Sequence, residues 1–291
     1  MKSSNASRFG IKWRRLIHKP LATIFKLTLK HKIKLMRNDF TPNGKPTIFA
    51  FTHVCKDDVA VTLCCLRYNA YVLAGYHRGL SRSVDGMGLR LNGVVWVDRG
   101  DKASRAEAME KVKNILCRGG DILIAPEAAW NLSPNIPMLN LWWGVIDMAV
   151  STGANIVPIA LDLVNDKYCI IIGENFCYKQ YPDKANAIAE LRDVLATMAW
   201  ELIEMKPMQK RSEITEKDWV DFTQNELARA PYVNRKKEES FVFRPKGEIS
   251  LGELLANMYG TEYKSMAVDY EDYKRVEKLI DNWTKTIKVR K

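Results

Sequence analysis

Between residues 45 and 205, short apolar runs alternate with longer segments in which apolar residues recur every three or four positions. Short runs of this kind are typical of buried strands, and the longer recurrence is typical of helices that cover a sheet. The predicted strands are Thr47–Phe51, Tyr71–Ala74, Val94–Val97, Asp121–Ala125, Ile156–Leu163 and Tyr168–Gly173. The predicted helices are Val59–Tyr68, Ser81–Leu91, Ser104–Cys117, Leu141–Ser151 and Lys184–Met205. This alternation predicts an α/β fold with a mixed, largely parallel sheet flanked by helices.

Residues 1–40 have the pattern of an amphipathic helical arm. Pro20 suits the first turn of a helix that begins there, with a separate helical piece around Ile11 to Ile17. Lys26, Lys30 and Lys34 form a row opposite the apolar positions. Those apolar positions are Ile17, Leu21, Ile24, Phe25, Leu29, Ile33 and Met36. The pattern is typical of a helix that lies in a membrane interface, and the alternative is a helix packed on its own domain with a solvated basic face.

From residue 206 the chain becomes more polar. A linker over 206–215 precedes three predicted charged amphipathic helices, Glu216–Ala228, Leu251–Tyr259 and Tyr270–Trp283. We therefore divide the chain into membrane-binding helices over 1–40, a main α/β domain over 41–205 and a helical C-terminal extension over 206–291.

The net charge of +11 is concentrated in the arm. Residues 1–40 contain eleven of the 45 basic residues and one of the 34 acidic residues, which leaves 34 basic and 33 acidic residues in the remainder. A basic chain suggests nucleic-acid binding as one function, although no recognition module accompanies the charge. No uncharged apolar run reaches 18 residues and no signal sequence is evident, so we expect neither a membrane span nor secretion.

The six cysteines form no CxxC pair. In a chain of this length we expect them to be reduced and mostly buried thiols.

A histidine follows the first predicted strand of the main domain. His53 stands directly after Thr52 and five positions before Asp58. Strand exits at the carboxyl edge of an α/β sheet commonly carry the chemistry, and histidine is suited to accept a proton near pH 7. A carboxylate in the first turn of the following helix can bind one ring nitrogen while the other faces a substrate.

Three further segments combine strand exits with unusual residues. Asp98 and Arg99 end one strand, Glu127 follows another, and Pro158 lies inside an apolar strand. Taken singly, each segment has a structural alternative. Asp98 and Arg99 are compatible with a surface ion pair, Glu127 with an acid at a helix N-terminus, and Pro158 with an edge strand.

Together, and in this order, the four segments resemble the glycerolipid acyltransferase family, typified by 1-acylglycerol-3-phosphate O-acyltransferase. The Asn-His-x4-Asp block of that family matches Thr52 to Asp58, and its glycine, apolar run and arginine match Gly93 to Arg99. Its Pro-Glu-Gly-Thr-Arg block matches Pro126 to Trp130 in part, and its apolar run around proline matches Ile156 to Ile159.

The resemblance implies an O-acyltransferase that moves a fatty acyl group from acyl-CoA or acyl carrier protein to a lysophospholipid or related lipid. His53 would be the general base, assisted by Asp58, with no covalent acyl-enzyme, no metal and no bound cofactor. The implied substrate-binding residues are Arg99, Glu127, Gly93, Pro158 and Trp130. In this reading Arg99 holds an anionic group, Glu127 positions the acceptor and Pro158 shapes the wall of the site.

Two departures from the family pattern concern the acceptor. Thr52 replaces the asparagine before the histidine, and Ala128, Ala129 and Trp130 replace Gly-Thr-Arg. Exchanging a charged guanidinium for an indole removes a phosphate ligand, which favours an acceptor less charged than lysophosphatidate. Trp142 and Trp143 are expected to pack in a core, with contact to lipid or to an acyl chain as the alternative.

These features favour a peripheral or monotopic enzyme on the cytoplasmic side of a membrane with anionic lipids. A catalytically degenerate lipid-binding protein and a nucleic-acid-binding protein are the alternatives.

Overall fold

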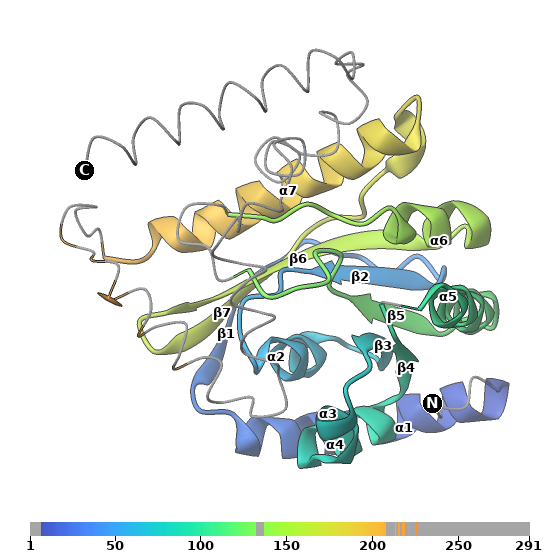
Figure 1. Cartoon of the computed structure of the whole chain (residues 1–291), viewed down its shortest axis with the longest axis horizontal. Coiled ribbons are helices and arrows are strands. Elements are labelled where there is room, and N and C mark those ends of the chain that lie inside the picture. Colours follow the sequence, from blue (N-terminus) through green and yellow to red (C-terminus); the bar gives the residue numbers. More distant parts are fainter. Residues whose placement is uncertain are drawn as a thin grey trace, which may run out of the picture.

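The computed structural model describes residues 7–99, 101–131 and 137–207, together with residues 213, 215, 217, 218, 221 and 225. Its core is a seven-stranded sheet in the order β1-β7-β6-β2-β5-β3-β4 (Figure 1). The strands are β1 Lys32–Asn38, β2 Thr47–Phe51, β3 Ala70–Gly75, β4 Val94–Val97, β5 Asp121–Ile124, β6 Asn155–Val164 and β7 Lys167–Ile172. The helices are α1 Arg8–Thr28, α2 Asp58–Cys65, α3 Arg78–Arg82, α4 Val84–Asn92, α5 Lys102–Cys117, α6 Gly144–Thr152, the 3-10 helix η1 Tyr178–Gln180 and α7 Lys184–Glu204.

The predicted α/β fold is confirmed. Every neighbouring pair of strands is parallel except β6 and β7, which form an antiparallel pair. The helices predicted between the strands are present with shifted ends, except that Ser81–Leu91 is divided into the end of α3 and α4 at Ser83.

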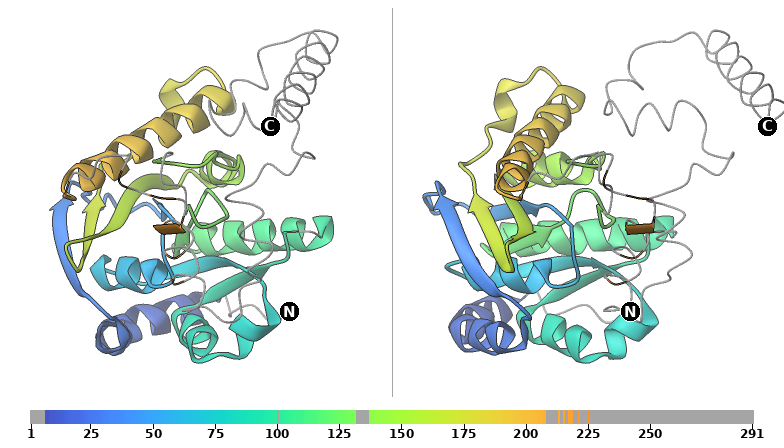
Figure 2. Two further views of the ribbon diagram at one scale, coloured as in Figure 1. Left: turned by 60° about the vertical axis from the view of Figure 1, so that its left-hand side comes forward. Right: turned by 90° about the vertical axis from the view of Figure 1, so that its left-hand side faces the viewer.

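Both faces of the sheet are covered, which explains the uninterrupted apolar runs. Along β2, Ile48 and Ala50 pack in the core beneath α5, α6 and α7, whereas Phe49 and Phe51 pack in the core beside α2. α7 and α1 lie on opposite sides of the sheet in both views of Figure 2. The alternation along β2 aims consecutive side chains at opposite layers.

The predicted arm differs from the structure in two respects. One continuous helix, α1, runs through Pro20, and residues 32–38 form the edge strand β1 rather than further helix. Lys32 to Leu35 alternate between basic and apolar residues, so they also fit the two-residue period of a strand. Pairing with β7 satisfies their backbone, and exposed lysines on such an edge discourage pairing with a further chain.

One face of α1 packs on the main domain. Ile11 and Leu21 are buried, and the Arg14 guanidinium donates to the Tyr71 hydroxyl at 3.3 Å. Arg15 forms an ion pair with Asp121 at 3.6 Å, at the start of β5. The arm is therefore held to the sheet by apolar and polar contacts.

The three helices predicted between residues 216 and 283 lie outside the described residues, apart from isolated positions. Among the described helices, none combines the length and the apolar character that a membrane crossing requires. All six cysteines are free thiols. Cys55 and Cys169 are buried and Cys64 and Cys65 are half-buried, whereas Cys117 and Cys177 are exposed, contrary to the expectation of mostly buried thiols.

Asp121 makes the stability of this fold depend on pH. Burial raises the pKa of its carboxyl from 3.8 to about 6, although the Thr47 N–H and Arg15 act in the opposite direction. A raised pKa means that the folded state holds its proton to higher pH than the unfolded state. The free energy of unfolding should therefore fall as pH rises from about 4 to about 6, by up to about 3 kcal/mol.

Asp121→Asn should remove this pH dependence, because an amide does not titrate. The substitution is conservative, since the Asn Oδ1 can still accept from the Thr47 N–H, a bond of 2.8 Å in the native protein. Urea unfolding across this pH range measures the effect. We expect the stability of the variant, relative to the native protein, to increase with pH. A difference that stays constant with pH would contradict the prediction.

Candidate active site

Three predicted site residues follow parallel strands at the same edge of the sheet. His53 follows β2, Glu127 follows β5 and Arg99 follows β4. The carboxyl ends of parallel strands meet at one edge, where α/β proteins usually bind their ligands. The order of strands therefore gathers residues that are far apart in the sequence.

His53 and Asp58 are in direct contact. The His53 Nδ1 lies 2.7 Å from Oδ2 of Asp58, the first residue of α2. The same oxygen accepts the backbone N–H groups of Val54 at 2.9 Å and Cys55 at 3.2 Å. Because a carboxylate only accepts, Nδ1 carries the proton and Nε2 is the accepting nitrogen of the ring. The Asp58 side chain is fully buried and that of His53 is 23% exposed, so the ring can reach a substrate.

The carboxylate of Glu127 is buried beneath this loop. Its Oε1 accepts the His53 N–H at 3.1 Å, and its Oε2 accepts the Leu139 N–H at 2.8 Å. Burial raises the pKa of Glu127 to about 7, against the opposing effect of the two N–H donors. Glu127 thus joins the loops after β2 and β5 through their backbones. Its role in positioning an acceptor stays a prediction.

Thr52 is a residue that we did not predict as part of the site. Its hydroxyl accepts the Leu161 N–H at 2.9 Å and donates to the Leu161 carbonyl, and its own N–H donates to the Ile159 carbonyl. These bonds continue the pairing of β2 with β6 past Phe51 and set the direction in which the chain delivers His53. The only sequence signal was its position directly before the histidine.

Trp130 and Ala128 follow Glu127 with unusual geometry. The Trp130 ring is buried and meets the His53 ring edge-on, with centroids 5.8 Å apart. The Asn131 N–H donates to the His53 carbonyl at 2.6 Å.

Ala128 has φ of +56°, in the left-handed region that favours glycine. The chain therefore keeps a turn suited to glycine while placing alanine there.

Arg99 and Gly93 lie at opposite ends of β4. Arg99 is exposed and lies beside Gly75 at the carboxyl end of β3; three strand spacings, roughly 14 Å, separate β4 from β2. Gly93, with φ of +114°, packs against Arg14 and Tyr71 before β4 begins. The structure does not bring Gly93 to the edge that carries His53, because β4 lies between them.

Pro158 lies inside β6, opposite Ala50, and β6 is an interior strand rather than an edge. Gly173 separates its ring from Met198 of α7 closely enough that a Cβ there would meet both side chains. Pro158 thus lies within the sheet beside Ala50, which precedes His53 by three residues. Its contact with a substrate stays a prediction.

Trp142 and Trp143 are exposed by 64% and 41%, so the expectation of core packing is wrong. The Trp142 N–H donates to the Pro126 carbonyl at 2.9 Å, which places this aromatic pair near the Glu127 loop. Within the described ranges, no group of three or more His, Cys, Asp or Glu side chains is arranged to hold a metal ion.

The chain is similar to known proteins in sequence pattern and in fold. Residues 32–162 match the family model described as Acyltransferase. The fold is similar to the crystal structure of the 1-acyl-sn-glycerophosphate (LPA) acyltransferase PlsC from Thermotoga maritima, with a TM-score of 0.51 and 18% identity, covering 68% of this chain and 84% of that chain. No curated protein is similar enough in sequence to count as a match.

The left-handed backbone at Ala128 predicts that Ala128→Gly stabilises the protein by about 1 kcal/mol, because glycine has no Cβ to strain this conformation. Ala129→Gly is the matched control: this buried neighbour lacks a positive φ, so the same change should destabilise the protein. Thermal and urea unfolding measure both. Destabilisation by Ala128→Gly would show that the turn is not strained.

Proposed function

We propose that this protein moves a fatty acyl group from a thioester to a hydroxyl of a lysophospholipid or related lipid, a proposal supported by the match of residues 32–162 to the family model described as Acyltransferase. The donor is acyl-CoA or acyl carrier protein, and no resident cofactor takes part. The observation that carries this proposal is the His53–Asp58 pair at the carboxyl edge of the sheet, held at 2.7 Å with Nε2 available as base.

In the proposed reaction, Nε2 of His53 takes the proton of the acceptor hydroxyl while its oxygen attacks the thioester carbon. A carbon–oxygen bond forms and the carbon–sulfur bond breaks. The proton then passes from His53 to the departing thiolate, which leaves as a free thiol. Asp58 holds the ring and stabilises its positive charge between these two transfers. The acyl group passes directly to the acceptor, so no nucleophilic side chain is needed.

One apolar and one charged residue at this edge support an acceptor molecule with two chemically different parts. Trp130 presents an apolar, buried ring beside His53, whereas the exposed Arg99 lies at the same edge but roughly 14 Å away by strand spacing. An acceptor with an uncharged region next to its hydroxyl and an anionic group further out fits both residues. Arg99 would bind that anionic group through its guanidinium.

Replacement of the base tests the reaction. Purified protein is incubated with acyl-CoA or acyl carrier protein and a panel of lysolipids, and thiol release is measured. We expect His53→Ala to lower the rate by about 10²- to 10⁴-fold, the usual contribution of general base catalysis. His77→Ala is the control, since His77 is an exposed histidine that follows a different strand, β3. Thiol release that persists unchanged in His53→Ala would exclude the mechanism, and lipid binding without any turnover would favour the degenerate alternative.

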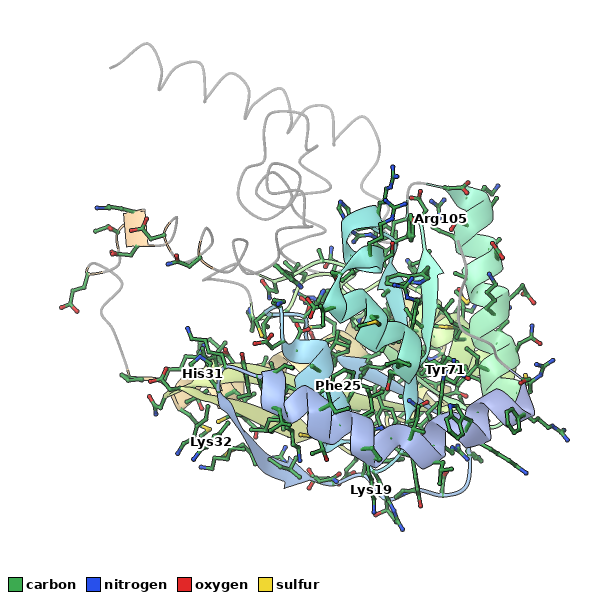
Figure 3. All side chains as sticks on the ribbon, turned by 90° about the horizontal axis from the view of Figure 1, so that it is seen from below. Lys19, Phe25, His31, Lys32, Tyr71 and Arg105 are labelled. Carbon is green, nitrogen blue, oxygen red and sulfur yellow. The ribbon has the colours of Figure 1, made fainter. Side chains whose placement is uncertain are left out.

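We further propose that α1 holds the enzyme on the cytoplasmic side of a membrane. Figure 3 shows α1 along the underside of the domain, beside α4, with Phe25 where the two helices meet. The outward face of α1 carries an apolar stripe that falls within roughly 80° around the helix axis. It consists of Phe9, Trp13, Leu16, Ile24 and Leu27, all more than half exposed. Lys12, Arg15, Lys19 and Lys26 flank it. Apolar side chains beside a basic row fit the interface of an anionic membrane.

Leu16→Glu should weaken binding to anionic vesicles by at least about tenfold, because it places a charge within the stripe. Val150→Glu makes a similar change at an exposed apolar position on α6 and should leave binding unchanged. Vesicle sedimentation at several salt concentrations measures both. Equal binding by the two variants would refute membrane contact by α1, and a preference for DNA or RNA over vesicles would favour the nucleic-acid alternative.

A further inference from the structure

The loop between β2 and α2 carries His53 and leads directly into Asp58, the first residue of α2, so the placement of this loop decides where the base lies. Asp57 occupies the N-cap position of α2, where an aspartate usually accepts a backbone N–H of the first turn. Its side chain makes no such capping bond. Its Oδ2 instead accepts the hydroxyl proton of Tyr168, a residue 111 positions later in the chain.

Tyr168 is a rigid point of attachment. It is fully buried in β7, between β1 and β6, and it pairs with Ile33 on one side and Leu163 on the other. Its ring also meets the ring of His31 edge-on at 5.5 Å. The phenol can therefore move little, and its hydroxyl reaches from the sheet to the start of α2.

This bond lies one residue from the carboxylate that orients the base. Asp57 and Asp58 are consecutive, and Asp58 Oδ2 accepts from the His53 ring and from the N–H groups of Val54 and Cys55. A shift of Asp57 moves the Asp58 backbone, and the His53 ring with it. An ion pair between Lys56 of this loop and Asp85, at 3.4 Å, is partly exposed and so constrains the loop less.

We infer that Tyr168 and Asp57 form a tether that positions the His53–Asp58 pair for the reaction. The inference rests on the proposed function for its kinetic consequence, but the tether itself is a property of the loop. Both residues act through Asp58 and neither touches the reacting atoms.

Tyr168→Phe removes only the hydroxyl and keeps the ring contact with His31. We expect kcat for thiol release to fall by about tenfold, equivalent to about 1.4 kcal/mol, because a small misplacement of a base is costly. KM should change by less than about twofold, since the substrate-binding surface is untouched. The matched control is Tyr178→Phe, which also removes a buried tyrosine hydroxyl, here bonded to the Ala149 carbonyl at 3.0 Å on another part of the fold. It should leave kcat unchanged.

Substitutions of Asp57 test the other end of the tether. Asp57→Ala should lower kcat as Tyr168→Phe does, and Asp57→Asn should retain most of it, because the amide oxygen still accepts from the phenol. The double variant Tyr168→Phe with Asp57→Ala should be no slower than either single variant, as expected for two ends of one interaction. Additive losses would overturn the inference.

Amide hydrogen exchange tests the tether independently of catalytic turnover. If the tether orders the loop, the N–H groups of Val54 and Cys55 should exchange faster in Tyr168→Phe than in Tyr178→Phe, measured on the full chain at equal folded fraction. Equal exchange at these two amides in both variants would overturn the tether. Faster exchange in a protein that releases no thiol from any thioester would support the tether and count against the proposed reaction.

Discussion

The buried carboxylate of Asp58 is the group on which the geometry of the site depends. A charge removed from water is tolerated only where donors replace the lost hydration. Here one oxygen accepts from the His53 ring and from two backbone N–H groups, whereas the other, Oδ1, is buried without a hydrogen-bond partner among the described residues. All three donors therefore converge on Oδ2 of Asp58. The chain must turn tightly around that oxygen, and the imidazole is aimed as a result.

Other buried polar groups hold this turn from outside. Glu127, in the loop after β5, accepts the His53 N–H, and Thr52 binds the backbone N–H and carbonyl of Leu161 in β6. Tyr168 reaches the loop from β7. The site therefore depends on contacts from four strands rather than on one motif. Such a scaffold suits the proposed reaction, in which the base must meet an incoming hydroxyl in a narrow range of positions.

Much of this could be predicted from the sequence because its signals are local. Buried strands read as apolar runs, and His53 and Asp58 are close enough that a loop followed by a helix brings them together. Glu127 was visible as an acid after a strand, but its partners were not, since backbone N–H groups have no sequence signature. Residues 32–35 satisfy both a helical and an alternating pattern, and only the pairing of this segment with the edge of β7 decides between them. Trp142 and Trp143 are as apolar as core residues, and only the path of the loop exposes them.

The parallel pairing of β1 with β7 also has a consequence for synthesis. β1 is an edge strand whose one neighbour in the sheet is β7. During synthesis, Lys32 therefore cannot pair until Lys167 has been added to the chain. At the usual speed of translation this interval lasts on the order of ten seconds. During it, α1 has left the ribosome while the strand that fixes its C-terminal end does not yet exist. The edge strand that follows α1 therefore has no partner strand until every other strand of the described sheet has been synthesised.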